Sequence, residues 1–179
     1  KLMARPLRAD IPIYLAVFKP RSVELAAEIA DGWLPIFFSP ERARETFPAP
    51  FARGDGFDIA PAVPALVSDD LESARDALRP YYALYIGGMG ARGTNFYNDL
   101  VASYGFEAEA KTIQDLFLDG KQRDAAAAVP DVLIDEMALV GPPDRIRDRL
   151  EAWKESGATT MLVSARDETT LRAVAEALG

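Results

Sequence analysis

The chain has 179 residues and a formal net charge of −8, and it contains neither histidine nor cysteine. The length fits a single domain, since domains commonly hold roughly 100–200 residues. The negative charge disfavours nucleic acid and anionic membranes as partners, because both repel an acidic surface. Disulfides are excluded, and no metal site is expected because imidazole and thiolate ligands are absent.

The hydropathy and the first residues of the chain indicate the cellular location that we expect for the protein. No apolar run approaches the roughly 20 residues that cross a bilayer. The first residues, KLMARPLRAD, are basic but lack the apolar core of a signal peptide. We therefore expect a cytoplasmic protein without membrane contact. Because the sequence begins at Lys1 rather than with methionine, we also expect a processed chain or a fragment.

The first part of the chain predicts a strand, a helix and a second strand with short connections. The apolar run IPIYLAVF predicts a strand at residues 11–17 that is buried on both faces. In the helix that follows, Leu25 and Ile29 share the apolar face, and Gly32 is the expected residue after the helix end. The run WLPIFF predicts the next buried strand at residues 33–37.

The middle of the chain predicts one further strand and then mainly helices. Ser39 is placed to cap a short helix. A third strand is expected at residues 58–66, where Pro61 and Pro64 should shorten it or place it on an edge. An aspartate then begins a helix that reaches towards Tyr85. Polar helical segments with glycine breaks follow.

The C-terminal part predicts a helix, a fourth strand at residues 159–164 and a final helix. The residues expected to point inward from the two helices are Ile146, Leu150, Trp153, Leu171, Val174 and Leu178. Carboxylate pairs such as Asp135–Glu136 suit helix caps or solvated faces. Short buried strands that alternate with amphipathic helices indicate a parallel sheet covered by helices. Four strands cannot close an eight-stranded barrel.

Two stretches of the chain resemble a known family. They read PIYLAVFKPRSVELAAEIADGWLPIFFSPE and ALVGPPDRIRDRLEAWKESGATTMLV. Both resemble the luciferase-like monooxygenase family, and within it the oxidoreductases that depend on the deazaflavin coenzyme F420. The resemblance implies an α/β fold in which this chain is the C-terminal half, strands five to eight, of a (β/α)8 TIM-type barrel. Residues 1–179 would form one segment, with a mostly helical insertion at about 86–137.

The turn VFKPRS marks the expected cofactor site. It lies where the first strand ends and a helix begins, at the face where such barrels hold their sites. A helix N-terminus attracts anions through its free N–H groups and its dipole, and two cations lie beside this one. By the resemblance, the contacts to the cofactor's phosphate are Phe18, Lys19, Arg21 and Ser22. The alternative is an ordinary turn in which Ser22 caps the helix.

The end of the second strand, LPIFFSPE, is expected to wall an apolar substrate pocket on the same face. The candidate contacts are Ile36, Phe37, Phe38 and Ser39. Because strand residues alternate, at least one of the three apolar residues must belong to the core. The later stretch RPYYALYIGGMGARG predicts either a lid over a hydrophobic substrate or a helix with Tyr81 and Tyr85 packed inward.

Three functions remain open from the sequence. The resemblance implies hydride transfer between coenzyme F420 and a small organic substrate, whose identity is unknown. An FMN-dependent monooxygenase on the same scaffold is the alternative enzyme. A non-catalytic half-barrel that binds or assembles with a partner is the third, because open sheet edges demand a cover. A homo-oligomer is expected. The catalytic residues are unknown, since the resemblance implies that they lie in the N-terminal half.

Overall fold

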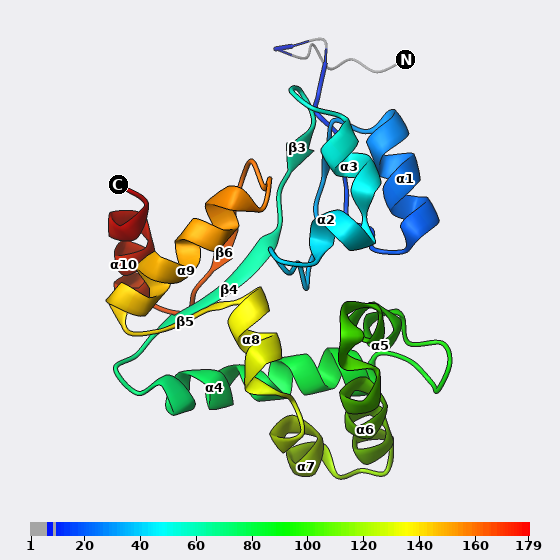
Figure 1. The fold of residues 1–179 in the computed structure, drawn as a ribbon, viewed down its shortest axis with the longest axis vertical. Helices are drawn as coiled ribbons and strands as arrows, with labels where there is room; N and C mark the ends of the chain where they lie inside the picture. The colour runs from blue at the N-terminus through cyan, green and yellow to red at the C-terminus, as the bar shows by residue number, and fades with distance from the viewer. Residues whose placement is uncertain (1–6, 9) are drawn as a thin grey trace.

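The computed structural model describes residues 7–8 and 10–179, and within them all strand pairs are parallel (Figure 1). The strands are β1 (Tyr14–Leu15), β2 (Gly32–Trp33), β3 (Asp58–Ile59), β4 (Ala62–Val67), β5 (Leu139–Gly141) and β6 (Leu162–Ser164). They form two sheets, with the orders β1-β2-β3 and β5-β4-β6. The parallel pairing predicted from the alternation of strands and helices is confirmed.

Helices surround these sheets. They are α1 (Pro20–Ile29), α2 (Ala43–Thr46), α3 (Pro48–Ala52), α4 (Leu71–Ala83), α5 (Phe96–Val101), α6 (Glu107–Leu118), α7 (Gln122–Ala127), α8 (Asp131–Met137), α9 (Pro143–Glu155) and α10 (Glu168–Leu178), with π-helical turns η1 (Leu84–Gly88) and η2 (Ala102–Phe106). Figure 1 shows α1 to α3 beside the first sheet and α9 and α10 beside the second. None of the helices in the described ranges is long and apolar enough to span a membrane.

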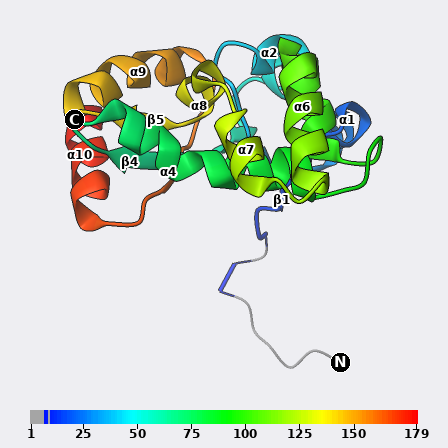
Figure 2. The ribbon, with the colours of Figure 1, turned by 90° about the horizontal axis from the view of Figure 1, so that it is seen from below.

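The helices from α4 to α8 lie below the two sheets in Figure 1. The view from below in Figure 2 shows α4 extending from beneath β4 and β5 to α6 and α7, and α4 contacts β5, α6 and α7. Asp70 caps α4 by accepting a hydrogen bond from the Ser73 N–H at 3.1 Å, as predicted for an aspartate at this position.

The predicted strands overlap the observed ones, but the second ends at Trp33 rather than at residue 37, and the third is divided into β3 and β4. β5 was not expected, because the segment before α9 was interpreted as a short helix followed by a Gly-Pro-Pro turn. β4 pairs with β6 through its first half and with β5 through its second half. The two prolines were expected to shorten this strand or to place it on an edge; Pro64 lies in a central strand, so the edge alternative is wrong. Pro61 lies in the short break between β3 and β4, where a missing N–H interrupts no ladder.

The first strand is shorter and far more exposed than predicted. Only Tyr14–Leu15 pair as a strand, and the side chains of Ile11 and Ile13 are 66% and 61% exposed. The reason is that β1 is an edge strand that pairs with β2 alone among the described residues. The apolar run thus belongs to a strand that is covered on one side only.

The predicted inward faces were wrong for α1 and partly wrong for α10. In α1, Leu25 and Ile29 are exposed, and the helix buries Val23, Ala26 and Ala27 instead. The longer apolar side chains therefore point away from β1 and β2.

In α10, Val174 is buried as expected, but Leu171 and Leu178 are each 47% exposed. The prediction for α9 is confirmed, since Ile146, Leu150 and Trp153 are all buried. Apolar periodicity thus identified the apolar face of each helix, but it did not show whether that face is covered.

Gly32 lies inside β2 and does not terminate α1, whose C-cap residue is Ala30. A Cβ atom at Gly32 would lie 2.4 Å from the Tyr14 ring and 2.8 Å from the Asp58 carbonyl oxygen. Glycine is required here because β1 and β3 approach β2 closely, rather than because a helix ends.

Candidate functional site

The turn after β1 forms a regular helix start. Lys19 is the N-cap residue of α1, and its carbonyl oxygen accepts the N–H groups of Ser22 and Val23, both at 2.9 Å. Ser22 is therefore the third helical residue rather than the cap, and its amide is already paired. Pro20 has no N–H, and the Arg21 N–H donates to no acceptor among the described residues.

The side chains of this turn pack against α5. The Lys19 ammonium lies 3.5 Å from the centre of the Phe96 ring, a cation–π contact. The Phe18 ring lies 4.7 Å from the Tyr97 ring and 6.5 Å from the Phe96 ring, measured between centroids. The predicted helical insertion and the predicted phosphate turn are therefore neighbours in space.

All four residues predicted to contact the cofactor line one cavity of about 600 Å³. The other walls come from α2, the turn before α3, α5 and η2, through Thr46, Phe47, Phe96, Asp99, Leu100 and Ser103. The cavity combines two cations, Lys19 and Arg21, with one carboxylate, Asp99. Its size and mixed lining suit a ligand with an anionic end and an aromatic or apolar body.

Phe37 lies at the centre of an aromatic cluster. Its ring stacks on Tyr82 at 5.1 Å and meets Tyr81, Tyr85 and Tyr97 edge-on at 5.6–5.8 Å. Its φ of 53° lies in the left-handed region, which costs a residue with a Cβ about 1–2 kcal/mol. The packing of four aromatic rings around Phe37 holds this backbone conformation in place.

The unusual backbone at Phe37 also changes the side-chain alternation expected after β2. Phe38 is 1% exposed and packs against Trp33 at 6.1 Å and Trp153 at 5.7 Å. Ile36 is half-buried, whereas Phe37 and Phe38 both point into the protein. The substrate-pocket role of these residues stays a prediction, with Phe38 placed in the core.

Ser39 is completely buried and belongs to a polar network that the sequence did not reveal. Its hydroxyl donates to Glu136 at 2.9 Å, and Arg42 donates two hydrogen bonds to the same carboxylate at 2.7 and 2.8 Å. Arg42 also caps α2, which begins later than predicted. Arg149 adds a bond to the Glu136 carbonyl oxygen at 2.7 Å. Glu136, expected on a solvated face, therefore pins α2 to α8 and α9.

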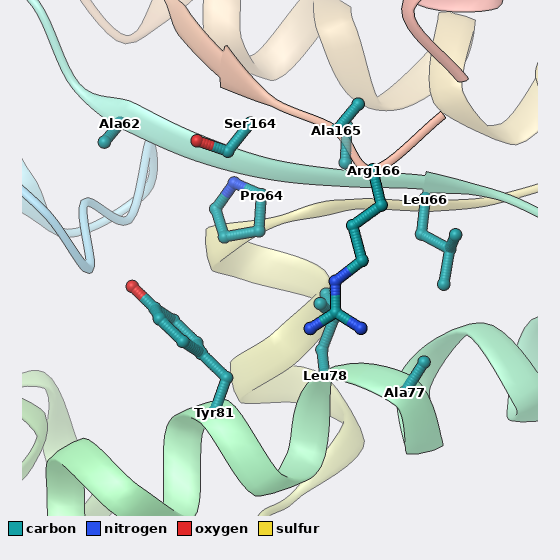
Figure 3. A pocket seen from close by; sticks show the side chains of 10 residues that line it. Ala62, Pro64, Leu66, Ala77, Leu78, Tyr81, Ser164, Ala165 and Arg166 are labelled. Carbon is teal, nitrogen blue, oxygen red and sulfur yellow. The ribbon is translucent and has the colours of Figure 1, made fainter. Parts of the chain in front are cut away.

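A second pocket, of about 320 Å³, lies between β4, the end of β6 and α4 (Figure 3). Its lining is Ala62, Pro64, Ala65, Leu66, Ala77, Leu78, Tyr81, Ser164, Ala165 and Arg166. Figure 3 shows the Tyr81 hydroxyl pointing from α4 towards β4, and the Arg166 guanidinium reaching down towards α4. Burial raises the pKa of Tyr81 to about 12, so its hydroxyl keeps its proton at neutral pH.

A row of aromatic rings joins the two cavities. Phe18 contacts Tyr97 at 4.7 Å, Tyr97 contacts Tyr85 at 4.8 Å, and Tyr85 contacts Tyr81 at 4.8 Å. Each of these four side chains is half-buried. The row is therefore a partly accessible wall that runs from the turn after β1 to the pocket below β4.

The first glycines after Tyr85 pack tightly against α6, whereas residues 91–94 are exposed. Cβ atoms added to Gly87 and Gly88 would lie 2.5 and 2.4 Å from atoms of Phe117. These glycines let η1 approach α6, and Asn95 donates to the carbonyl of Ile86 at 2.8 Å. The interpretation as a packed helix, rather than as a lid, fits this arrangement.

Comparison with known proteins assigns the family. Residues 1–160 match the family described as luciferase-like monooxygenase. The chain belongs to this family. The resemblance inferred from the two sequence stretches is thus confirmed.

Two relatives and one solved structure are similar to this chain. A candidate coenzyme F420-dependent oxidoreductase of Mycobacterium tuberculosis is 39% identical over 184 residues, which cover 98% of this chain and 53% of that protein. The 5,10-methylenetetrahydromethanopterin reductase of Archaeoglobus fulgidus is 27% identical over 163 residues, covering 87% and 48%. The coenzyme F420-dependent tetrahydromethanopterin reductase from Methanopyrus kandleri shares the fold, with a TM-score of 0.66, 21% identity and coverage of 93% and 48%. The luciferase-like chain therefore spans about half the length of the relatives it matches.

Proposed function

We propose that this luciferase-like chain is the C-terminal half of a cytoplasmic oxidoreductase that transfers hydride between coenzyme F420 and a small organic substrate. The observation that carries the proposal is the cavity in which Phe18, Lys19, Arg21 and Ser22 come together at the start of α1. The names of the similar proteins add support, since they describe coenzyme F420-dependent enzymes.

The half-barrel part of the proposal is supported by where apolar surface is exposed. At the β1 end of the sheets, Leu25 and Ile29 of α1 are 47% and 67% exposed. At the β6 end, Leu162 is 44% exposed, and Leu171 of α10 is exposed as well. Strands one to four of a complete barrel would cover both ends at once. Residues 1–179 would then form one half-barrel segment, and residues from about 86 to 137 would form a mostly helical insertion in it.

The residues at the turn fit a phosphate group. Arg21 offers an unpaired N–H at the helix start, and the Ser22 hydroxyl lines the same cavity. Lys19 and Arg21 both line the cavity, so two cations are within reach of an anion there. The deazaflavin, when bound, supplies the hydride chemistry. Phe18 and Tyr97 would exclude water along its body, and Tyr81 would present a protonated hydroxyl near the substrate.

FMN remains the competing cofactor, because the matched family is described as a monooxygenase and FMN also carries a phosphate. Titration of the full-length protein with coenzyme F420 and, separately, with FMN distinguishes the two by the change in cofactor fluorescence. We expect coenzyme F420 to bind at least about tenfold more tightly, a difference of about 1.4 kcal/mol. Tighter binding of FMN would favour the monooxygenase. If the protein binds neither cofactor, the non-catalytic module is favoured. The oligomeric state of the same sample would show whether the protein assembles as a homo-oligomer.

A further inference from the structure

The pocket between β4, β6 and α4 holds a cation in a mainly apolar frame (Figure 3). Pro64, Leu66 and Leu78 supply the apolar walls, and Arg166 enters from the end of β6. Arg166 is an exposed residue that lines the pocket, and within residues 7–8 and 10–179 no hydrogen bond or ion pair engages its guanidinium. A guanidinium that lines a pocket without a counter-ion is available to a ligand.

The acids that follow Arg166 are already engaged elsewhere. The Asp167 carboxylate accepts the Thr170 N–H at 2.8 Å and the Thr170 hydroxyl at 3.0 Å, as the cap of α10. The Glu168 carboxylate pairs with Arg172 at 2.6 Å. Neither carboxylate is therefore free to neutralise Arg166.

We propose that this pocket binds the carboxylate of a small apolar substrate, and that Arg166 is the residue that selects the anion. The proposal rests on the function proposed above, since the pocket would hold the substrate of the same reaction. A guanidinium matches a carboxylate with two parallel hydrogen bonds. The hydroxyls of Ser164 and Tyr81 line the same pocket and can donate further bonds.

The size and position of the pocket fit such a substrate. A volume of about 320 Å³ lies in the range of small-molecule sites and accommodates a single ring with a carboxylate. Tyr81 belongs both to this pocket and to the aromatic row that leads to Phe18. A substrate anchored at Arg166 would therefore extend its apolar end along the row, towards the proposed cofactor cavity.

The test is calorimetric titration of the full-length protein with cyclohexanecarboxylate and with its neutral amide, cyclohexanecarboxamide. The two probes share their shape and differ in charge. We expect the parent to bind the carboxylate roughly tenfold more tightly, and Arg166→Gln to abolish that preference. Arg166→Lys should retain part of it, because the charge remains while the planar fork is lost. The matched control is Arg147→Gln, which removes a positive charge from an exposed pair with Asp144 on α9, outside the pocket lining, and should change nothing.

Equal binding of both probes by the parent, or an unchanged preference in Arg166→Gln, would overturn the proposal. Titration of the same variants with coenzyme F420 shows whether Arg166 binds a carboxylate of the substrate or one of the coenzyme. An unchanged affinity for coenzyme F420 in Arg166→Gln places the carboxylate on the substrate. A tenfold loss of that affinity, with the probe preference intact, contradicts the proposal. If the parent fails to bind coenzyme F420 but shows a preference that depends on Arg166, the proposed function fails while this inference stands.

Discussion

Phe18 and Tyr97 lie with their ring centroids 4.7 Å apart, one in the turn after β1 and the other in the first turn of α5. This contact makes the helical segment after α4 one wall of the proposed cofactor cavity. Tyr97 also meets Phe37 at 5.6 Å, so the cavity is connected to the aromatic cluster behind β2. The geometry of the turn therefore depends on side chains that lie far from it in the sequence.

Removing the carboxylate of Asp99 should strengthen cofactor binding. Asp99 lines the same cavity as Lys19 and Arg21, where its charge repels a phosphate. Asp99→Asn should tighten binding of coenzyme F420 about two- to fivefold, with a larger effect at low salt. Asp124→Asn, on α7 and outside this cavity, is the control and should have no effect. Weaker binding in Asp99→Asn would mean that the carboxylate itself contacts the cofactor.

Phe37 should respond to substitution in a way that reveals its backbone strain. Phe37→Ala and Phe37→Gly both empty the centre of the aromatic cluster, and each should cost about 3–5 kcal/mol in the free energy of unfolding. At a φ of 53°, glycine avoids the strain that alanine keeps, so the glycine variant should be the more stable by about 1 kcal/mol. Urea denaturation of the full-length variants measures the difference. If the alanine variant is the more stable of the two, Phe37 does not have a left-handed backbone conformation.

Asp135 joins α4, α8 and α9 and should contribute to stability in a pH-dependent way. It accepts two hydrogen bonds from Arg75, at 2.6 and 3.1 Å, and pairs with Arg145 at 2.8 Å. Burial opposes ionisation of this carboxyl, but the hydrogen bonds from Arg75 and the charge of Arg145 hold the pKa of Asp135 below its ordinary value. Asp135→Asn should therefore lose about 1.5–3 kcal/mol at neutral pH.

The sign of the pH dependence follows from the lowered pKa. The stabilisation is present above the ordinary pKa of an aspartate, about 3.8, and is lost as the pH falls through the lower folded value. The gap between parent and Asp135→Asn should thus narrow under acid. Asp144→Asn is the control, since its ion pair with Arg147 is exposed and should contribute less than about 0.5 kcal/mol. A gap that widens on acidification is incompatible with this assignment.

Local signals in the sequence predicted much of the fold. Capping chemistry predicted that α4 starts at Asp69 or Asp70, and the structure has Asp70; apolar spacing identified the buried face of α9. The exposed faces of α1 and α10 were not predictable in the same way. Leu25 and Leu171 have the spacing of core residues, but whether another element covers them depends on the rest of the fold. Spacing shows which face of a helix is apolar, and it carries no information about what lies opposite.

In the candidate site too, residues that are close in the sequence were predictable, and residues brought together only by folding were not. Phe18, Lys19, Arg21 and Ser22 are neighbours in one turn, so a short motif was enough to place them together. Phe96 reaches the same cavity only through folding, and no local pattern links it to the turn. Arg166 could have been noticed, because a cation directly after a strand of this fold type lies at the face that carries the site.

The ion pair between the partly exposed Arg42 and the buried Glu136 could not be predicted from the sequence. Arg42 is the N-cap residue of α2, and Glu136 lies in α8. Nothing in the sequence around either residue indicates that the two form an ion pair. A carboxylate in an acidic stretch is usually solvated, so the sequence favoured that interpretation for Glu136. Only the folded chain brings Arg42 and Ser39 to it.

The central claim, that the start of α1 holds the cofactor's phosphate, is tested most directly by Ser22→Asp. The substitution puts a carboxylate in the first turn of α1, where it should leave the helix intact or stabilise it slightly, because acids are favoured at helix N-termini. Thr169→Asp is the matched control, since it adds the same charge to the first turn of α10, away from the cavity. Fluorescence titration of the full-length proteins with coenzyme F420 is the measurement. We predict that Ser22→Asp weakens binding at least about tenfold while Thr169→Asp binds like the parent. Equal affinity of Ser22→Asp and the parent would show that the phosphate is held elsewhere.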